Sequence, residues 1–268
     1  MIPSIDYHQI EAGLMQESAK RASRHFKSMG CLLMSGVFDR LFIGEIREQL
    51  NEICGDLSNP TSIAYHNALQ VGDRRMMIPV PFTGAFNDQR FYANPVLYSF
   101  LKDVLGCGFV LNGLGAVVSF PGAADQHIHR DHPMLFGSPV DDFLPPFAVT
   151  VIIPLVELNE KSGTTRMWPG SHLMKFLLEN IEIPVSERPH IDPTAGPGDC
   201  LLMDYRLYHS GLANTSDAIR PILYLIYSRP WFRDSVNYKK HLPLNPSADE
   251  LERIPDNYRH LFAHSKVH

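Results

Sequence analysis

The spacing of hydrophobic residues changes along the chain, from a helical period in the first third to short β-like runs afterwards. Near the start, apolar residues recur at helical spacing at five positions: Ile10, Met15, Ala19, Ala22 and Phe26. This spacing predicts an amphipathic helix that ends at Gly30. The apolar run over residues 31–37 then predicts a short strand.

Two more helices are predicted before residue 108. Asp39 is placed to cap a helix that runs to Ile53. Its apolar face is expected to hold Leu41, Ile46 and Leu50. A further helix is predicted over residues 94–105, because proline follows Asn94 and is well accommodated at a first helical position. Residues 55–88 are polar and rich in turn residues, which favours loops that cover a pocket.

From residue 109 the pattern becomes that of short strands separated by Pro-Gly and Ser-Gly turns. The predicted strands cover residues 109–120, 148–156, 164–168, 199–208 and 221–227. Such strands without βαβ alternation indicate a mainly β fold with flanking helices, built as a barrel or sandwich. We expect a single domain over residues 1–268, with a helical part to about 108, a β core to about 230 and a tail over 231–268.

Composition excludes several classes of partner. The chain has 268 residues and a formal net charge of −5, with no basic run, so nucleic acid is not expected. No apolar stretch approaches the roughly 20 residues of a membrane span, and the start of the chain does not resemble a secretory signal. The four cysteines are scattered and form no CxxC pair, as in a reducing compartment. These features predict a cytoplasmic protein without a membrane partner, compatible with a homodimer.

A group of potential metal ligands accompanies the β-rich part. His129 and Asp131 are two residues apart, so in an extended strand both side chains point to the same face. His209, after the apolar run of a later predicted strand, is the candidate for a third ligand. Two histidines and one carboxylate on one face of Fe(II) leave positions open for oxygen chemistry. Arg220 follows eleven residues after His209 and can hold the far carboxylate of a co-substrate.

An alternative ligand pair has the same spacing. His127 shares the parity of His129, so the two imidazoles can face one metal, as in the HxH pair of cupin-type metalloenzymes that use no co-substrate. Those enzymes also use a nearby glutamate, and no glutamate follows here before Glu157. Taken singly, a histidine at a strand end and a lone arginine are more often ordinary surface or core residues.

Three segments, in the order found here, resemble the phytanoyl-CoA dioxygenase family. They are residues 121–131, residues 162–172 with the sequence Pro169-Gly170-Ser171-His172, and residues 198–220 with His209, Asn214 and Arg220. The resemblance implies a double-stranded β-helix (jelly-roll, cupin-like) core that uses Fe(II), with 2-oxoglutarate and O₂ as co-substrates. One departure is Ser162, which stands where the family often has asparagine.

The resemblance also implies roles for individual residues. His129, Asp131 and His209 would bind iron, and Arg220 would pair with the distal carboxylate of 2-oxoglutarate. 2-Oxoglutarate would take two of the three open iron positions, and O₂ the third. Thr165 and Gln126 hold the places of residues that contact the co-substrate in many members.

The expected reaction is oxidation, most simply hydroxylation, of a C–H bond in a small molecule, with release of succinate and CO₂. A role in secondary metabolism is compatible with this chemistry. Asp131 favours such oxidation over halogenation, because halogenating relatives have a small residue at that position. Candidate substrate contacts are Arg75, Met77, His132, Tyr205 and Trp231. The remaining alternative is a non-catalytic jelly-roll protein whose metal is vestigial or structural.

Overall fold

The computed structural model describes residues 4–6, 15–57, 68–173, 182–237 and 244–265. Its strands are β1 (Ser4–Asp6), β2 (Cys31–Ser35), β3 (Leu69–Gly72), β4 (Arg75–Pro79), β5 (Val110–Ser119), β6 (Ala148–Pro154), β7 (Thr165–Met167), β8 (Cys200–Asp204), β9 (His209–Gly211) and β10 (Arg220–Ser228). Its helices are α1 (Met15–Met29), α2 (Arg40–Cys54), α3 (Gln89–Tyr92), α4 (Pro95–Leu105) and α6 (Ala248–Glu252), with 3₁₀ turns η4 (Gly84–Asn87), η5 (Pro139–Phe143), η6 (Val185–Glu187) and η7 (Asp256–Phe262).

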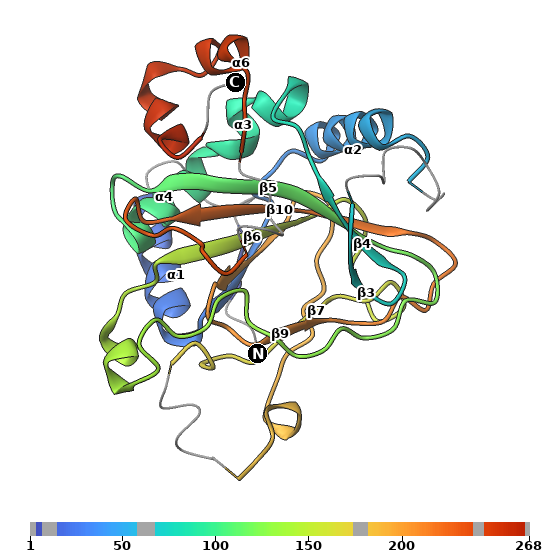
Figure 1. The fold of residues 1–268 in the computed structure, drawn as a ribbon, viewed down its shortest axis with the longest axis vertical. Helices are drawn as coiled ribbons and strands as arrows, with labels where there is room; N and C mark the ends of the chain where they lie inside the picture. Colours follow the sequence, from blue (N-terminus) through green and yellow to red (C-terminus); the bar gives the residue numbers. More distant parts are fainter. Residues whose placement is uncertain (1–3, 7–14, 58–67, 174–181, 238–243, 266–268) are drawn as a thin grey trace.

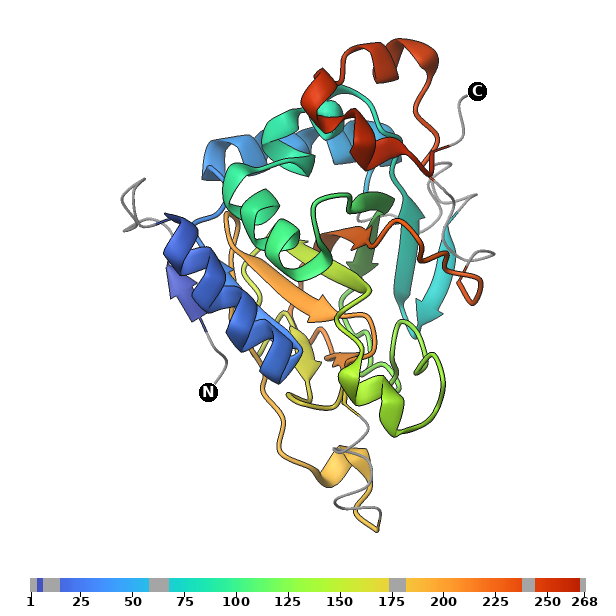
Figure 2. The same ribbon diagram turned by 90° about the vertical axis from the view of Figure 1, so that its left-hand side faces the viewer.

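Two sheets form the core. The large sheet has the strand order β1-β2-β8-β6-β10-β5-β4-β3, and only its β1–β2 pair is parallel. The small sheet pairs β7 with β9. Figures 1 and 2 show the small sheet beside one face of the large sheet, with α2, α3 and α4 packed around the other. This arrangement is a jelly-roll core with flanking helices, and it confirms the predicted fold class.

The predicted helices are present, and one detail of their packing was wrong. Asp39 caps α2 by accepting a hydrogen bond of 2.9 Å from the backbone N–H of Phe42, and Asn94 caps α4. Leu41 was expected on the buried face of α2 but is 81% exposed, because the face turned to the core starts one residue later. The buried residues of α2 are Phe42, Ile43, Ile46, Leu50 and Cys54. Ile10, assigned to the first helix, lies outside the described residues.

The segment over residues 55–88 was predicted to be loops, and part of it is instead a hairpin that widens the large sheet. β4 pairs with β5 so that Met77 lies opposite Val117 and Arg75 opposite Ser119. β3 pairs in turn with β4. Turn residues at both ends hid a five-residue strand, and residues 58–67 lie outside the described part. The N-terminal part therefore supplies strands as well as helices.

The strand predicted over residues 199–208 is shorter in the structure, because only residues 200–204 form β8. β8 ends at Asp204, whose carboxylate accepts hydrogen bonds of 2.9 Å from the backbone N–H, Nε and Nη2 of Arg206. Both side chains are buried, so the turn is fixed by a buried ion pair. The chain then crosses to the small sheet, where His209 is the first residue of β9.

Burial differs among the cysteines and among the aromatic residues of the tail. Cys31, Cys54 and Cys200 are buried, whereas Cys107 is exposed. In the tail, Phe232 packs on Phe147 with ring centroids 4.6 Å apart, but Trp231 is 59% exposed. Within the described residues, none of the helices has both the length and the apolar character needed to cross a membrane.

Candidate metal and co-substrate site

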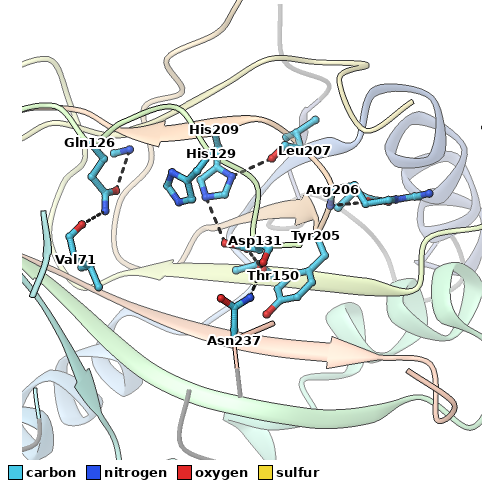
Figure 3. A network of polar contacts seen from close by, with 12 residues as sticks. Val71, Gln126, His129, Asp131, Thr150, Tyr205, Arg206, Leu207, His209 and Asn237 are labelled. Carbon is cyan, nitrogen blue, oxygen red and sulfur yellow. Dashed lines mark hydrogen bonds and ion pairs between the residues drawn. The ribbon is translucent and has the colours of Figure 1, made fainter. Parts of the chain in front are cut away.

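The structure brings together the three predicted metal ligands. One ligand atom from each of His129, Asp131 and His209 lies within 4.8 Å of the other two, and this is the one such His/Cys/Asp/Glu group found among the described residues. The backbones of His129 and His209 exchange N–H···O hydrogen bonds of 3.0 and 2.9 Å, although the 129 segment forms only an isolated bridge. Figure 3 shows the three side chains converging between the two sheets.

Backbone carbonyls fix the tautomer of both imidazoles. Nδ1 of His129 lies 2.9 Å from the carbonyl oxygen of His127, and Nδ1 of His209 lies 3.0 Å from that of Leu207. A carbonyl only accepts, so Nδ1 carries the hydrogen and each Nε2 keeps a lone pair for a metal. Burial, reinforced by His209, lowers the pKa of His129 to about 4. The His129 imidazole is therefore neutral at neutral pH, the form that binds metals.

Asp131 is held from two sides. The hydroxyl of Thr150 donates to its Oδ2 at 2.7 Å, while Oδ1 lies 3.6 Å from Nε2 of His209. The amide of Asn237 donates to the main-chain oxygen of Asp131, and the next residue, His132, donates its N–H to the carbonyl of Tyr205. Two imidazole nitrogens and one carboxylate oxygen, all from one side, suit a ferrous ion.

A cavity of about 600 Å³ adjoins these ligands. The inner faces of β4, β5, β6, β8 and β10 form its floor, and its apolar lining includes Val117, Ile152, Met203, Ile222 and Ile226. This volume lies within the range of roughly 300–1,000 Å³ that is typical of small-molecule sites. Besides the three ligands, Arg75, Gln126, Thr165 and Arg220 also line it.

Arg220 contributes a buried cation to this cavity. The residue is 1% exposed, and its Nε and Nη2 have no hydrogen-bond partner within the described part of the chain. Burial, together with the nearby Arg75, lowers the pKa of Arg220 to about 9, so the guanidinium is still charged at neutral pH. An unpaired buried charge is costly. This arginine therefore fits an anion that enters the cavity.

A second arginine lies in the same row of the sheet. Arg75 and Arg220 are both in register with Ser119, one on each side of it, so their side chains point to the same face. Arg75 donates to Oε1 of Gln126 at 3.0 Å and to the carbonyls of Leu212 and Ala124 at 2.9 and 3.2 Å. Its Nε and the hydroxyl of Ser119 lack partners among the described residues.

Gly211 makes room for this arrangement. A Cβ atom at this position would overlap Nη1 of Arg75 and Oε1 of Gln126. The backbone N–H of Gly211 also donates to Oε1 of Gln126 at 3.2 Å, and Nε2 of Gln126 donates to the carbonyl of Val71 at 2.7 Å. Gln126 and Arg75 thus form one wall of the cavity. Figure 3 shows the hydrogen bond from Gln126 to Val71.

Two predicted substrate contacts lie elsewhere. His132 is buried between aromatic rings, 5.2 Å from Phe232 and 5.7 Å from Phe147 by ring centroids, and it does not line the cavity. Trp231 points to solvent and does not line the cavity either. Sequence position alone does not reveal which layer a side chain enters. Met77 and Tyr205 do line the cavity, and Tyr205 also donates to Asp234.

Three polar residues near the site were missed by the sequence reasoning. Thr150 had a signal, since it is the one polar residue in the apolar run over residues 148–154. Ser119 and Asn237 had none, because their places depend on sheet register and on the path of the tail. His127, the alternative ligand, lines the cavity but is exposed and is not part of the metal-ligand group.

The chain is similar in sequence to two dioxygenases from Aspergillus species. Dioxygenase af480 from Aspergillus fumigatus is 30% identical over 166 residues, which cover 59% of this chain and 52% of that protein. Dioxygenase aneA from Aspergillus aculeatus is 24% identical over 238 residues, covering 85% of this chain and 78% of that protein. The match to the first thus spans about half of its length.

Solved structures show the same fold at low identity. The epimerase SnoN from nogalamycin biosynthesis, in complex with Fe³⁺, alpha ketoglutarate and nogalamycin RO, has a TM-score of 0.60 and 18% identity, covering 80% of this chain and 84% of that chain. HygX from Streptomyces hygroscopicus, with nickel and 2-oxoglutarate bound, has a TM-score of 0.59 and 18% identity, covering 79% of this chain and 87% of that chain. These likenesses support the jelly-roll assignment.

The family profile of phytanoyl-CoA dioxygenase (PhyH) matches residues 26–222, which is well over half of the chain. The matched range includes all described strands except β1 and most of β10. It contains the three predicted metal ligands and Arg220. The chain therefore belongs to the phytanoyl-CoA dioxygenase (PhyH) family.

Proposed function

We propose that this protein uses Fe(II), 2-oxoglutarate and O₂ to hydroxylate a C–H bond of a small molecule, with release of succinate and CO₂. One observation carries the proposal: a single cavity holds the His129, Asp131 and His209 group together with the buried, partly unpaired guanidinium of Arg220. The reaction balances, since one oxygen atom enters succinate and the other enters the hydroxyl group of the product.

Each polar residue of the cavity has a part in this proposal. His129, Asp131 and His209 hold the iron, which when bound supplies the oxygen-activating chemistry. Arg220 binds the far carboxylate of 2-oxoglutarate, because its planar guanidinium matches a carboxylate and stays charged. Thr165, buried at the start of β7 and facing the cavity, donates its hydroxyl to the same carboxylate. Gln126 and Arg75 form the adjacent wall.

The apolar floor of the cavity is proposed to receive the substrate. Met77 and Tyr205 lie among its lining residues, together with the inner faces of β6 and β10. Two structural neighbours were solved with small molecules bound, nogalamycin RO in SnoN and hygromycin B in HygX. These ligands support a small molecule of secondary metabolism as the substrate class. SnoN is an epimerase, whereas hydroxylation is proposed here because a carboxylate, Asp131, stands in the ligand group.

The alternatives account less well for the cavity. A non-catalytic metal site, or a cupin-type enzyme without a co-substrate, has no use for a buried cation beside the metal ligands. In such a protein, an Arg220 side chain without a counter-ion would lower the stability of the fold and would serve no binding role. A carboxylate co-substrate gives that charge a partner.

The proposal is tested by supplying the metal-free protein with Fe(II), ascorbate and 2-oxoglutarate in air. We expect succinate to form slowly without a substrate and faster when a panel of small apolar compounds includes one that fits. Omitting Fe(II) or replacing it by Zn(II) should stop succinate formation. Folded, iron-loaded protein that consumes no 2-oxoglutarate, with or without the panel, would argue for the non-catalytic alternative.

A further inference from the structure

Thr150 interrupts an apolar row on the inner face of the large sheet. It lies on β6 between Met203 of β8 and Ile226 of β10, its partners in register. Thr150 is buried and lines the cavity. A hydroxyl in such surroundings needs a partner, since burying it unpaired is costly. Its partner is Oδ2 of Asp131, to which it donates at 2.7 Å (Figure 3).

We propose that Thr150 is a positioning residue that reserves one oxygen of Asp131 and so makes this carboxylate a one-oxygen metal ligand. The inference rests on the proposed function, because it concerns how the iron is held. Oδ2 is occupied by the Thr150 hydroxyl, and Oδ1 is the oxygen near Nε2 of His209, at 3.6 Å. The remaining oxygen therefore points to the side where the imidazoles converge.

The hydrogen bond from Thr150 to Asp131 matters because it affects how many coordination positions on the iron stay open. Two imidazoles and one carboxylate oxygen occupy three positions of an octahedral iron and leave three. 2-Oxoglutarate takes two of them, and oxygen needs the third. If Asp131 bound through both oxygens, only two positions would remain. A hydroxyl that holds Oδ2 away keeps the last position available.

The backbone of Asp131 is fixed independently of Thr150. Asn237 donates to its carbonyl, and the neighbouring His132 donates its N–H to the carbonyl of Tyr205. The 129 segment is also bridged to His209. Removing the Thr150 hydroxyl should therefore release only the rotation of the carboxylate, and the segment should stay in place.

The test compares Thr150→Val, which keeps the shape and removes the hydroxyl, with Thr150→Ser, which keeps the hydroxyl. Anaerobic titration with Mn(II) or Co(II) should give a dissociation constant about 10- to 100-fold higher for Thr150→Val, the usual effect of losing a partner that orients a ligand. Thr150→Ser should stay close to the wild type. Thr150→Ala, run in parallel, should repeat the loss if the valine variant does not fold.

A matched control is Thr164→Val. Thr164 is also buried, but its hydroxyl donates to the carbonyl of Pro193, away from the cavity. The metal affinity of Thr164→Val should equal that of the wild type. Thermal unfolding of the metal-free proteins measures any general loss of stability. Equal metal affinity of wild type and both Thr150→Val and Thr150→Ala would overturn the positioning role. A wild-type protein that binds no metal would instead overturn the proposed function itself.

Discussion

Asp131→Ala is expected to abolish iron-dependent turnover of 2-oxoglutarate. The substitution removes the one carboxylate of the metal-ligand group and leaves two imidazoles. The loss should exceed the about 10- to 100-fold effect of removing a residue that only orients a ligand. Succinate formation and iron content after gel filtration measure the two sides of this prediction.

Asp131→Asn serves as the matched variant, because it keeps the size of the side chain and removes the charge. It should retain the contact to Asn237, which uses the backbone oxygen of residue 131. We expect it to fold like the wild type and to bind iron weakly. Wild-type turnover by Asp131→Ala would remove this residue from the ligand set and favour the pair of His127 and His129.

Arg220→Ala is expected to raise the 2-oxoglutarate requirement steeply while iron stays bound. Truncating one partner of a buried charge pair costs about 2–5 kcal/mol, which corresponds to roughly 30-fold to several-thousand-fold in the dissociation constant. Arg220 has the burial and the unpaired nitrogen atoms for such a contact. The measurement is the concentration of 2-oxoglutarate that gives half-maximal succinate formation, alongside an independent iron titration.

Arg229→Ala is the control for this prediction. Arg229 follows the last residue of β10, at the opposite end of the strand from Arg220, and donates to the carbonyls of Pro146 and Val104. The Arg229→Ala variant loses the same charge at the other end of β10, away from the cavity, so the 2-oxoglutarate requirement should not change. If Arg220→Ala lost iron to the same extent as 2-oxoglutarate, the assignment of Arg220 to the co-substrate would be wrong.

Sequence periodicity was enough for the elements whose signals are local. The caps at Asp39 and Asn94 and the apolar runs of β5, β6 and β10 are readable because each depends on neighbouring residues. The β3–β4 hairpin was missed because turn residues surround it and its pairing with β5 is long-range. The end of β8 was also missed, since it depends on the buried pair of Asp204 and Arg206.

The candidate site follows the same division. The spacing of His129 and Asp131, together with the family resemblance, was enough to select the group that the structure brings together. Asn237 lies on a tail segment that returns from a distant part of the chain, so no local pattern reveals it. Thr150 stands out as the one polar residue of its apolar run, but its contact with Asp131 depends on the path of another segment. His132, predicted as a substrate contact, is buried and does not line the cavity, because adjacency to a ligand does not say whether a side chain enters the cavity or the core.

The most direct measurement is an anaerobic titration of the Fe(II) protein with 2-oxoglutarate, followed by visible absorption. We predict a charge-transfer band that grows to saturation as 2-oxoglutarate binds beside Arg220, and no band with succinate, which lacks the keto group. Folded, iron-loaded protein that develops no band at any 2-oxoglutarate concentration would contradict the proposed iron and 2-oxoglutarate site.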